Sequence, residues 1–315
     1  MREKVRTKVV ITGGAGFIGS HIAEHWISKG ADVHIIDNLR SGHLKNIEIN
    51  KDAHFHQNSI TEKEVVRNIL KDCDYIHHLA ALISVPESVL NPYECVDINV
   101  TGLLNVLESA KETNVKKIVL SSSAAIYGDN PITPKTTDLY PAPKSPYGIT
   151  KLDGEYYLAM YNEMYGLGAV SLRYFNVFGP RQDPKSQYAA AIPIFVSKAV
   201  KNEPIIVYGD GEQTRDFIYV KDVVKANVTA ALSDKNGVFN VASGNKISIN
   251  QLIELILNET GSSSKVEYQE ERPGDIKHSL ASINETSQQI GFKADYDLIT
   301  GLKNTISYFI DLYKA

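Results

Sequence analysis

The sequence contains little cysteine: Cys73 and Cys95 are the only two among 315 residues. Two thiols do not make a disulfide framework, and no C-x-x-C pair provides a zinc or redox motif, so we interpret both as reduced structural side chains. Long apolar runs are also lacking. None approaches the roughly 18 residues that a membrane helix needs, and the first residues lack the pattern of a signal peptide. We therefore expect a cytoplasmic protein.

An excess of positive charge is absent as well. The chain has 33 Lys and Arg residues against 37 Asp and Glu residues, a formal net charge of −4. It lacks the basic field that nucleic acid or an anionic membrane requires, so we expect neither as a partner. A phosphate-bearing ligand has to be held by a local site. The 43% hydrophobic and 22% charged residues are typical of a folded globular protein and exclude disorder.

Strand-like and helix-like segments alternate from residue 8 to residue 175. A capping box of Thr61 and Glu64 predicts one helix start, and Ser145-Pro146 predicts another. The alternation predicts an α/β fold: a Rossmann-like doubly wound parallel sheet with helices on both faces. The expected strands are 8–12, 33–36, 75–79, 117–121 and 169–175, and the expected helices are 17–29, 61–70, 97–112 and 147–164.

Proline and charged residues cluster after Gly179, where we place a domain boundary. A chain of this length suits two cores. We predict a main domain over 1–180 and a smaller C-terminal α/β substrate domain over 181–315, from which the segment 216–243 returns to the main sheet. Further strands are expected at 205–208, 238–241 and 266–268, and helices at 220–232, 249–260 and 298–313.

A glycine-rich turn, TGGAGFIG, follows the first strand, with glycines at 13, 16 and 19. Without side chains there, the backbone can approach a pyrophosphate whose charge lies at the N-terminus of the next helix. A glycine string alone fits an ordinary tight turn equally well. Its position between a strand and a helix, with Asp37 at the end of the second strand, favours dinucleotide binding.

Asp37 also bears on which dinucleotide binds. A carboxylate at this position accepts both ribose hydroxyls and repels a 2′-phosphate, which predicts NAD rather than NADP. Arg40, only three residues later, leaves NADP open. The alternative for Asp37 is a helix cap or turn residue.

Three further positions suggest acid–base chemistry. Ser121-Ser122-Ser123 follows the fourth strand, where sites of parallel sheets open, and Tyr147 and Lys151 share one helix face. An ammonium and an oxidised nicotinamide nearby both favour phenolate, which can take a proton from a substrate hydroxyl while a serine orients it. With 17 tyrosines such a pair arises by chance, but the order of glycine turn, serines and pair favours an enzyme over a non-catalytic dinucleotide-binding protein.

Two other groups have ordinary interpretations. His77 and His78 are neighbours on a strand and point to opposite faces, so we expect no metal site there or elsewhere. Tyr156, Tyr157, Tyr161 and Tyr165 form a stripe that is typical of helix packing or of a face between subunits.

Over nearly its whole length the chain resembles the extended short-chain dehydrogenase/reductase family. Within that family it resembles the nucleotide-sugar 4-epimerases. The likeness is strongest to bacterial UDP-N-acetylglucosamine/N-acetylgalactosamine 4-epimerases and extends to UDP-glucose 4-epimerases. The segments that carry it are TGGAGFIGS (12–20), HLAAL (78–82), SSSAAIYGD (121–129), SPYGITK (145–151), LRYFNVFGPRQDP (172–184), YGDGEQTRDFIYVKDV (208–223) and RPGD (272–275).

The resemblance implies roles for individual residues. Ser123, Tyr147 and Lys151 would be catalytic. NAD would be held by Gly13, Gly16, Phe17, Ile18, Asp37, Asn38, Ser41, Gly42, Ser59, Ile60, Leu79, Ala80, Ala81, Asn99, Ser121, Tyr147, Lys151 and Tyr174. The UDP-sugar substrate would be held by Ser84, Ser123, Tyr147, Asn176, Ala190, Ala191, Tyr208, Arg215, Arg272, Asp275 and Ser279.

The implied activity is a 4-epimerase that interconverts UDP-GlcNAc with UDP-GalNAc, and UDP-glucose with UDP-galactose, through a 4-keto sugar. Ala124 and Ala125 follow Ser123 where family members that dehydrate the sugar carry acids, and Ser279 leaves room for an acetamido group. Ser59 and Ser282 depart from the acids usual in the family. A UDP-glucuronate 4-epimerase or a 4-keto-sugar reductase on the same scaffold remains an alternative. The family also implies a homodimer.

Overall fold

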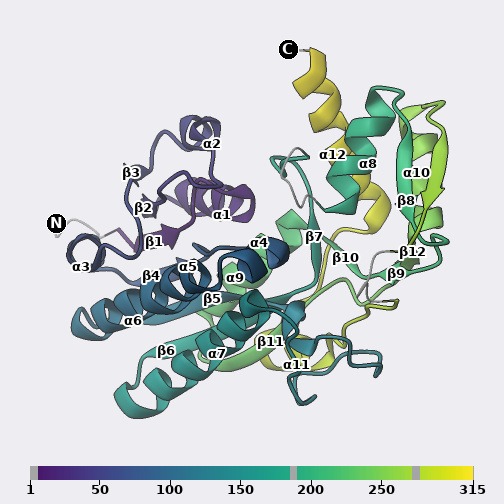
Figure 1. Ribbon diagram of the computed structural model, residues 1–315. Coiled ribbons are helices and arrows are strands. Elements are labelled where there is room, and N and C mark those ends of the chain that lie inside the picture. Colours follow the sequence, from purple (N-terminus) through teal and green to yellow (C-terminus); the bar gives the residue numbers. More distant parts are fainter. Residues whose placement is uncertain (1–5, 185–189, 272–276, 315) are drawn as a thin grey trace.

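The computed structural model describes residues 6–184, 190–271 and 277–314. A parallel seven-stranded sheet lies at its centre, in the order β11-β6-β5-β4-β1-β2-β3 (Figure 1). The order reverses between β1 and β4, and a crevice forms at such a point outside the carboxyl ends of the strands. The strands are β1 (Lys8–Thr12), β2 (Asp32–Ile36), β3 (His54–His56), β4 (Tyr75–His78), β5 (Lys117–Ser123), β6 (Gly168–Tyr174) and β11 (Gly237–Val241).

Helices cover both faces of this sheet, as the alternating sequence predicts. α1 (Phe17–Ser28) and α9 (Val220–Leu232) pack on one face, against a core that includes Val9 and Ile11. α3 (Lys63–Ile69), α6 (Gly102–Glu112) and α7 (Pro146–Tyr165) cover the other face, over Val10. Successive residues of β1 therefore enter opposite cores, as alternation along a fully buried strand requires. The predicted Rossmann-like fold is confirmed.

The predicted start and end of α7 are also confirmed. Ser145 accepts a hydrogen bond from the backbone N–H of Gly148 at 3.1 Å, and Pro146 is the first helical residue. The helix ends at Gly166, whose φ of +70° lies in the left-handed region that glycine adopts at little cost. These signals fix the helix on which both Tyr147 and Lys151 lie.

The capping box predicted for α3 is wrong. The helix begins at Lys63, and the Thr61 hydroxyl hydrogen-bonds the Ser59 hydroxyl at 2.8 Å instead of capping the helix. The helix expected over 97–112 begins with a π-helical turn, η1 (Asp97–Thr101). Up to residue 175, sequence analysis missed β3 and three short α-helices, α2 (Leu44–Ile49), α4 (Val85–Leu90) and α5 (Pro92–Val96).

The chain beyond residue 180 builds a separate core and also returns to the sheet. β11 pairs with β6, and α9 packs beside α1. The proposed boundary at 180 stays a prediction. Two-stranded pairs form between β7 (Asn176–Phe178) and β10 (Phe217–Tyr219), β9 (Thr214–Arg215) and β12 (Ile247–Ser248), and β8 (Ile205–Tyr208) and β13 (Val266–Gln269). The other elements there are α8 (Ala191–Val200), α10 (Ile249–Thr260), α11 (Asn284–Ile290) and α12 (Leu298–Lys314). Beyond residue 175, the elements that sequence analysis missed are β7, β9, β10, β12, α8 and α11.

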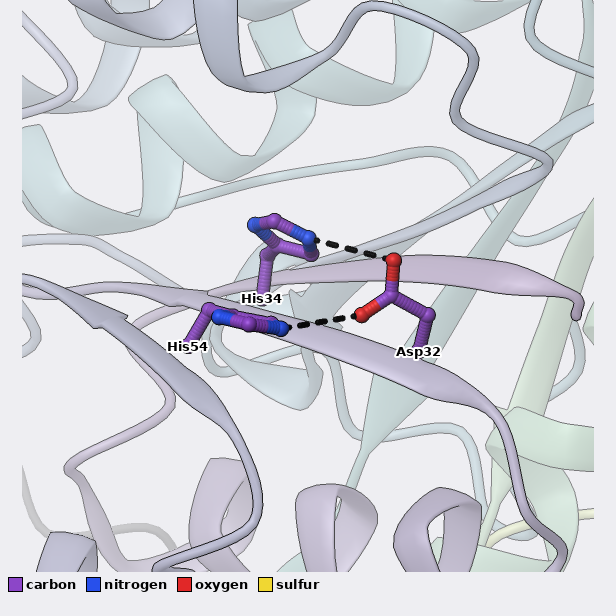
Figure 2. Close-up of side chains that lie close together, drawn as sticks. All are labelled: Asp32, His34 and His54. Carbon is purple, nitrogen blue, oxygen red and sulfur yellow. Dashed lines mark ion pairs between the residues drawn. The ribbon is translucent and has the colours of Figure 1, made fainter.

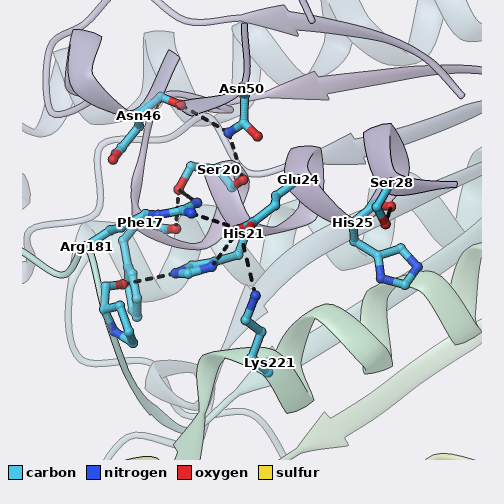
Figure 3. Close-up of polar contacts among 11 residues, drawn as sticks. Phe17, Ser20, His21, Glu24, His25, Ser28, Asn46, Asn50, Arg181 and Lys221 are labelled. Carbon is cyan, nitrogen blue, oxygen red and sulfur yellow. Dashed lines mark hydrogen bonds and ion pairs between the residues drawn. The ribbon is translucent and has the colours of Figure 1, made fainter. Parts of the chain in front are cut away.

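The crossing from one part to the other is fastened to α1 (Figure 3). His21 lies 3.0 Å from the carbonyl oxygen of Pro180, and Arg181 forms an ion pair with Glu24 at 2.8 Å. Lys221, on α9, lies 3.7 Å from the same carboxylate. This helix thus holds the chain where it leaves the main sheet.

Within the described residues, no helix has both the length and the apolar composition that a membrane crossing needs.

A buried ion pair ties β5, β6 and α7 together. Arg173 donates two hydrogen bonds to Glu155, at 2.9 and 2.7 Å, and the two side chains are only 4% and 3% exposed. The Ser122 hydroxyl donates to the same carboxylate at 2.5 Å, and the Arg173 guanidinium stacks 4.8 Å from the Tyr127 ring centroid. Both oxygens of the Glu155 carboxylate therefore accept hydrogen bonds inside the protein.

We predict that Arg173→Met lowers the free energy of unfolding by about 3–5 kcal/mol, because it leaves the Glu155 carboxylate buried without its partner. Urea denaturation of the purified protein measures the change. The matched control is Lys144→Met, which breaks an exposed pair with Asp129 and should cost less than about 1 kcal/mol. Equal effects of the two substitutions would contradict this account of the pair.

Candidate active site

The glycine turn after β1 is shaped by close backbone contacts. Gly13 has a φ of +74°, and a Cβ atom on it would lie 2.7 Å from the Ala80 nitrogen. A Cβ atom on Gly19 would lie 2.3 Å from the Gly13 oxygen. Gly16 precedes α1 as its N-cap, with no side chain capping the helix and no acid in its first turn. The positive end of α1 is thus left for an anionic group such as a pyrophosphate.

Asp37 lies beside this turn. One carboxylate oxygen accepts from the Ala15 N–H at 3.0 Å and the other from the Leu39 N–H at 2.8 Å. Burial raises the pKa of Asp37, and these two N–H groups act in the opposite direction. A Cβ atom on Gly42 would lie 2.8 Å from the carboxylate, so only glycine lets the chain pass so close. The Asp37 carboxylate is therefore fixed to the glycine turn by a backbone N–H of that turn, as an acid that binds ribose needs to be.

Arg40, which left NADP open in the sequence, is engaged elsewhere. Its guanidinium forms ion pairs with Glu87 of α4, at 2.8 Å, and with Glu94 of α5. A cation that recognises a 2′-phosphate has to be free to face it. Asn38 and Ser41 flank this residue and are exposed, and the Asn38 side chain accepts from the Arg40 N–H at 3.1 Å. These contacts favour NAD.

The loop after β4 lies against the glycine turn. The backbone N–H of Leu79 donates to the Thr12 carbonyl at 3.0 Å, and that of Ala80 to the Thr12 hydroxyl at 3.2 Å. Ala81, the next residue in the loop, is partly buried. These three predicted cofactor residues therefore lie at the end of β4, next to the turn after β1. Both strand ends border the crevice expected where the strand order reverses.

The Asn99 side chain connects the loop after β4 to α7. It bonds the N–H and the carbonyl of Leu82, at 2.7 and 3.1 Å, and the Thr150 hydroxyl at 2.9 Å. The loop is thereby fixed to α7. Ser84 uses its hydroxyl to accept from Glu87 and cap α4.

Ser59 and Ile60 lie in the turn before α3. The Ser59 N–H donates to the Glu62 carboxylate at 2.6 Å. Ile60 is only 3% exposed and packs in the core beside Gly102, where a Cβ atom would lie 2.6 Å from its side chain. In the structure Ile60 is a core residue, and the binding role implied by the resemblance stays a prediction for both.

The paired histidines of β4 point to opposite faces, as expected. His77 accepts from the Trp26 indole at 2.9 Å, and His78 hydrogen-bonds the Thr12 hydroxyl at 2.9 Å. Burial, followed by the nearby Lys151 ammonium, lowers the pKa of His78 to about 3. His78 is therefore neutral near pH 7 and part of the structure behind the glycine turn.

The three predicted catalytic residues come together at the carboxyl end of β5. Ser123 is its last residue, and the interaction of its hydroxyl with the Tyr147 phenol lowers the pKa of that phenol. The Lys151 ammonium lies 5.8 Å from the centroid of the Tyr147 ring and donates to the Ser121 carbonyl at 2.7 Å. The Tyr147 phenol, the Ser123 hydroxyl and the buried Lys151 ammonium thus lie close together at the end of β5.

Burial shapes the acid–base properties of this group. It lowers the pKa of Lys151 to about 8, so the ammonium still carries its proton at pH 7. Burial raises the pKa of Tyr147, and the Ser123 hydrogen bond lowers it by a smaller amount. The protein alone therefore favours the neutral phenol, whereas the lowering expected from sequence includes the charge of an oxidised nicotinamide and stays a prediction. A further positive charge near the phenol is needed to favour phenolate.

Ser121 and Tyr174 connect this group to the middle of the sheet. The Ser121 hydroxyl donates to the Tyr174 phenol at 3.1 Å, and the phenol bonds the Asn227 side chain of α9. Burial raises the pKa of Tyr174 to about 12, so it stays protonated and orients its neighbours. Asn227 was not identified from the sequence.

Tyr147 is also held in place by two residues that sequence analysis did not identify, Ser88 and Thr150. Its backbone N–H donates to the Ser88 hydroxyl of α4 at 3.2 Å, and its carbonyl accepts from the Thr150 hydroxyl at 2.9 Å. Thr150 precedes Lys151 and is buried, as is Ser88. A small polar residue on a short helix carries no local signal, so Ser88 could not have been found without the fold.

Apart from Ser84, Ser123 and Tyr147, the predicted substrate residues lie at residue 176 or beyond. Asn176 donates through its backbone and its side chain to the Asp216 carbonyl, at 3.2 and 3.1 Å. The Asp216 carboxylate is fully buried and accepts from Ser243, Gly244 and Ala281, which fixes two separate segments around it. This organising acid was also missed.

Ala190 and Ala191 form the start of α8, with Ala190 as its N-cap. The Arg215 guanidinium donates to the Thr214 carbonyl at 3.0 Å, and the Ser279 N–H bonds the same carbonyl. Tyr208 lines a pocket of about 310 Å³ whose wall also includes Gln213, Lys277 and His278. Arg272 and Asp275 lie outside the described residues. The substrate roles of all these residues stay predictions.

Comparison with known proteins places this arrangement in a family. Residues 9–242 match the model of the NAD dependent epimerase/dehydratase family. The UDP-N-acetylglucosamine 4-epimerase from Methanobrevibacter ruminantium M1, solved in complex with UDP-N-acetylmuramic acid, is 46% identical, with a TM-score of 0.94 and coverage of 98% of this chain and 99% of that one. The UDP-glucose 4-epimerase from Thermotoga maritima, solved with UDP-glucose, is 38% identical, with a TM-score of 0.94 and coverage of 98% and 100%.

A UDP-glucuronate 4-epimerase from Thermodesulfobacterium geofontis is 33% identical over 322 residues, which cover 97% of this chain and 98% of that protein. The predictions of the fold, of an isomerase and of NAD as cofactor are confirmed by these likenesses. The glycine turn, the free positive end of α1 and Asp37 fit that cofactor in this structure. The chain belongs to the NAD dependent epimerase/dehydratase family.

Proposed function

We propose that this protein is a UDP-sugar 4-epimerase that interconverts UDP-GlcNAc with UDP-GalNAc and UDP-glucose with UDP-galactose. The observation that carries the proposal is the grouping of Ser123, Tyr147 and Lys151 at the end of β5. Two strands away lies the glycine turn suited to NAD. The activities of the similar proteins support the reaction type.

In the proposed mechanism Tyr147 is the acid–base group. Its phenolate takes the proton of the sugar 4-hydroxyl, and the Ser123 hydroxyl orients that oxygen. Bound NAD supplies a hydride acceptor and donor and a positive ring that favours phenolate. Lys151 adds a second positive charge 5.8 Å from the centroid of the Tyr147 ring, and a neighbouring positive charge favours phenolate.

The proton leaves the 4-hydroxyl oxygen and the hydride leaves carbon 4, and both return to the atoms that lost them, so the reaction has no net redox change. Inversion requires the 4-keto sugar to present its other face before both return. We propose that Asn176, Ala190, Ala191, Tyr208, Arg215, Arg272 and Asp275 hold the UDP half, and Ser84 and Ser279 the sugar. Firm binding of UDP and loose binding of the hexose allow the 4-keto sugar to rotate in this way. Arginine is well suited to the pyrophosphate charge in an otherwise acidic chain.

The small residues around the sugar support the N-acetylated substrate. Ala124 and Ala125 provide no acid beside Ser123 for dehydration, and Ser279 has a short side chain. The likeness to a UDP-glucuronate 4-epimerase keeps that substrate as the second candidate. A 4-keto-sugar reductase would consume NADH in proportion to product.

The test is product analysis by NMR. Purified protein mixed with UDP-GlcNAc, without added NADH, should form UDP-GalNAc, and UDP-glucose should form UDP-galactose. UDP-glucuronate should remain unchanged. Conversion of UDP-glucuronate alone would favour the second candidate, and a strict NADH requirement with stoichiometric consumption would favour a reductase.

We predict that Tyr147→Phe lowers kcat at least about 10²-fold, since it removes the group that moves the proton. NAD content, measured by absorbance after denaturation, should stay at the wild-type level. The matched control is Tyr156→Phe, an exposed tyrosine of the same helix, which should keep full activity. Unchanged turnover in Tyr147→Phe would refute the mechanism.

The ionisation of Lys151 predicts a pH dependence. Lys151→Met removes a positive charge 5.8 Å from the Tyr147 ring, which disfavours phenolate. The acidic limb of the kcat profile should move to higher pH by roughly one to two units. Because the pKa of Lys151 is lowered to about 8, the advantage of wild type over this variant should be largest below pH 8 and shrink above it.

Measurement of kcat as a function of pH for wild type, Lys151→Met and Lys151→Arg tests these expectations. Arginine keeps the charge, so its acidic limb should stay closer to wild type. A profile of Lys151→Met that coincides with wild type at every pH would rule out the proposed influence of the ammonium.

We also propose that the protein acts in the cytoplasm as a homodimer. Along α7 the side chains of Ile149, Tyr156, Met160 and Met164 are exposed at helical spacing, next to exposed Val96 of α5. Tyr161 of the same helix is instead buried and donates to Glu108. The tyrosine stripe thus divides into a packing part and an apolar outer face that suits a second copy of this helix.

Sedimentation velocity at micromolar concentration should give twice the chain mass. Met160→Glu, which places a charge in that face, should shift the protein to monomer. Tyr140→Glu is the control, because Tyr140 is 84% exposed in a loop outside the face, and it should leave the dimer intact. A monomeric wild type would exclude the proposed dimer.

A further inference from the structure

Polar side chains gather at the outer edge of the sheet, on the last two strands, β2 and β3. Asp32 and His34 alternate with the buried Val33 along β2, so both point to the same face. His54 lies opposite His34 in the parallel register of β3. Figure 2 shows the result: the Asp32 carboxylate directs one oxygen toward each of the two imidazoles.

Two of the distances between these groups, one from each oxygen of Asp32, match those between neighbouring ligands of a metal ion. The Asp32 oxygens lie 3.4 Å from His34 Nε2 and 3.3 Å from His54 Nε2. Ligand bonds of about 2.0–2.2 Å in a tetrahedral zinc site put neighbouring donor atoms roughly 3.3–3.5 Å apart. One donor atom from each of the three residues can be chosen so that all lie within 4.8 Å of one another. Since His54 is 63% exposed, its ring can turn inward and shorten the longest separation.

A fourth residue fixes one of the rings. His56 Nε2 lies 3.0 Å from His34 Nδ1, and the two rings stack with centroids 5.3 Å apart. With one nitrogen of His34 bonded in this way, the other nitrogen is oriented toward Asp32. Metal-ligating histidines usually have this second hydrogen bond, which sets the tautomer and the ring orientation.

We propose that Asp32, His34 and His54 bind a divalent metal ion of the zinc type, with His56 as the residue that positions His34. Two imidazoles and one carboxylate favour zinc and neighbouring transition metals over magnesium or calcium, which prefer all-oxygen sites. A water molecule would complete a tetrahedral set. The expectation from sequence was that no metal site exists, and the proposal departs from it.

The site is separate from the catalytic group. Asp32 begins β2 and pairs with Lys8 at the start of β1, whereas Ser123 is the last residue of β5 and Asp37 follows the last residue of β2. The Lys8 ammonium is the neighbouring cation, and it donates to the Lys71 carbonyl at 2.8 Å. Bound metal would join the three-residue edge strand β3 to β2. The expected effect is therefore on stability and not on the proton transfer at Tyr147.

The test is equilibrium dialysis of tag-free wild-type protein against micromolar Zn²⁺, with the bound metal measured by atomic absorption. Wild type should bind one zinc ion per chain, and its Tm should rise until that ratio is reached. His34→Ala and Asp32→Asn should lose both effects. His56→Phe should weaken binding by about 10–100-fold, as expected for a residue that orients a ligand.

Two further variants guard against indirect effects. His54→Gln changes an exposed side chain, so a folded protein is expected, and it should also lose the zinc. His278→Ala removes an exposed histidine elsewhere and should bind zinc as wild type does. Absence of stoichiometric zinc in wild type, or wild-type binding in both His34→Ala and His54→Gln, would overturn the proposal.

Discussion

The hydrogen bond from the Lys151 ammonium to the Ser121 carbonyl is the contact on which the candidate site depends. It places a buried positive charge at the end of β5 and holds α7 against that strand. Because Tyr147 and Lys151 are one turn apart on this helix, the same bond fixes where the phenol lies relative to Ser123. Burial costs the ammonium part of its proton affinity, which is why the pKa of Lys151 falls to about 8.

Buried polar groups behind the site hold its parts in one arrangement. The Arg173–Glu155 pair joins β6 to α7, and Ser122 links β5 to the same carboxylate. In the second part of the chain, Asp216 collects donors from separate loops. Each of these carboxylates is satisfied by several hydrogen bonds, and a satisfied buried network specifies position more strictly than apolar packing does. The site thus rests on groups that themselves do no chemistry.

The two candidate sites lie at opposite ends of the strands of the central sheet. The carboxyl ends carry the glycine turn, Asp37 and the proposed acid–base group, where the strand order reverses and parallel sheets form their sites. The opposite end of β2, beside the edge strand β3, carries the Asp32, His34 and His54 cluster. An edge strand of three residues has few backbone partners, so a cross-link between side chains has most to add there.

The sequence by itself determined the features whose cause is local. The strand, glycine turn and helix over 8–28, the Ser145-Pro146 start of α7 and the spacing of Tyr147 and Lys151 each depend on residues within a few positions of one another. Only the tertiary structure decided the Arg173–Glu155 pair, the Ser88 contact to Tyr147 and the alignment of Asp32 with His54. Such contacts join side chains from different elements, and no local periodicity encodes which of them will meet.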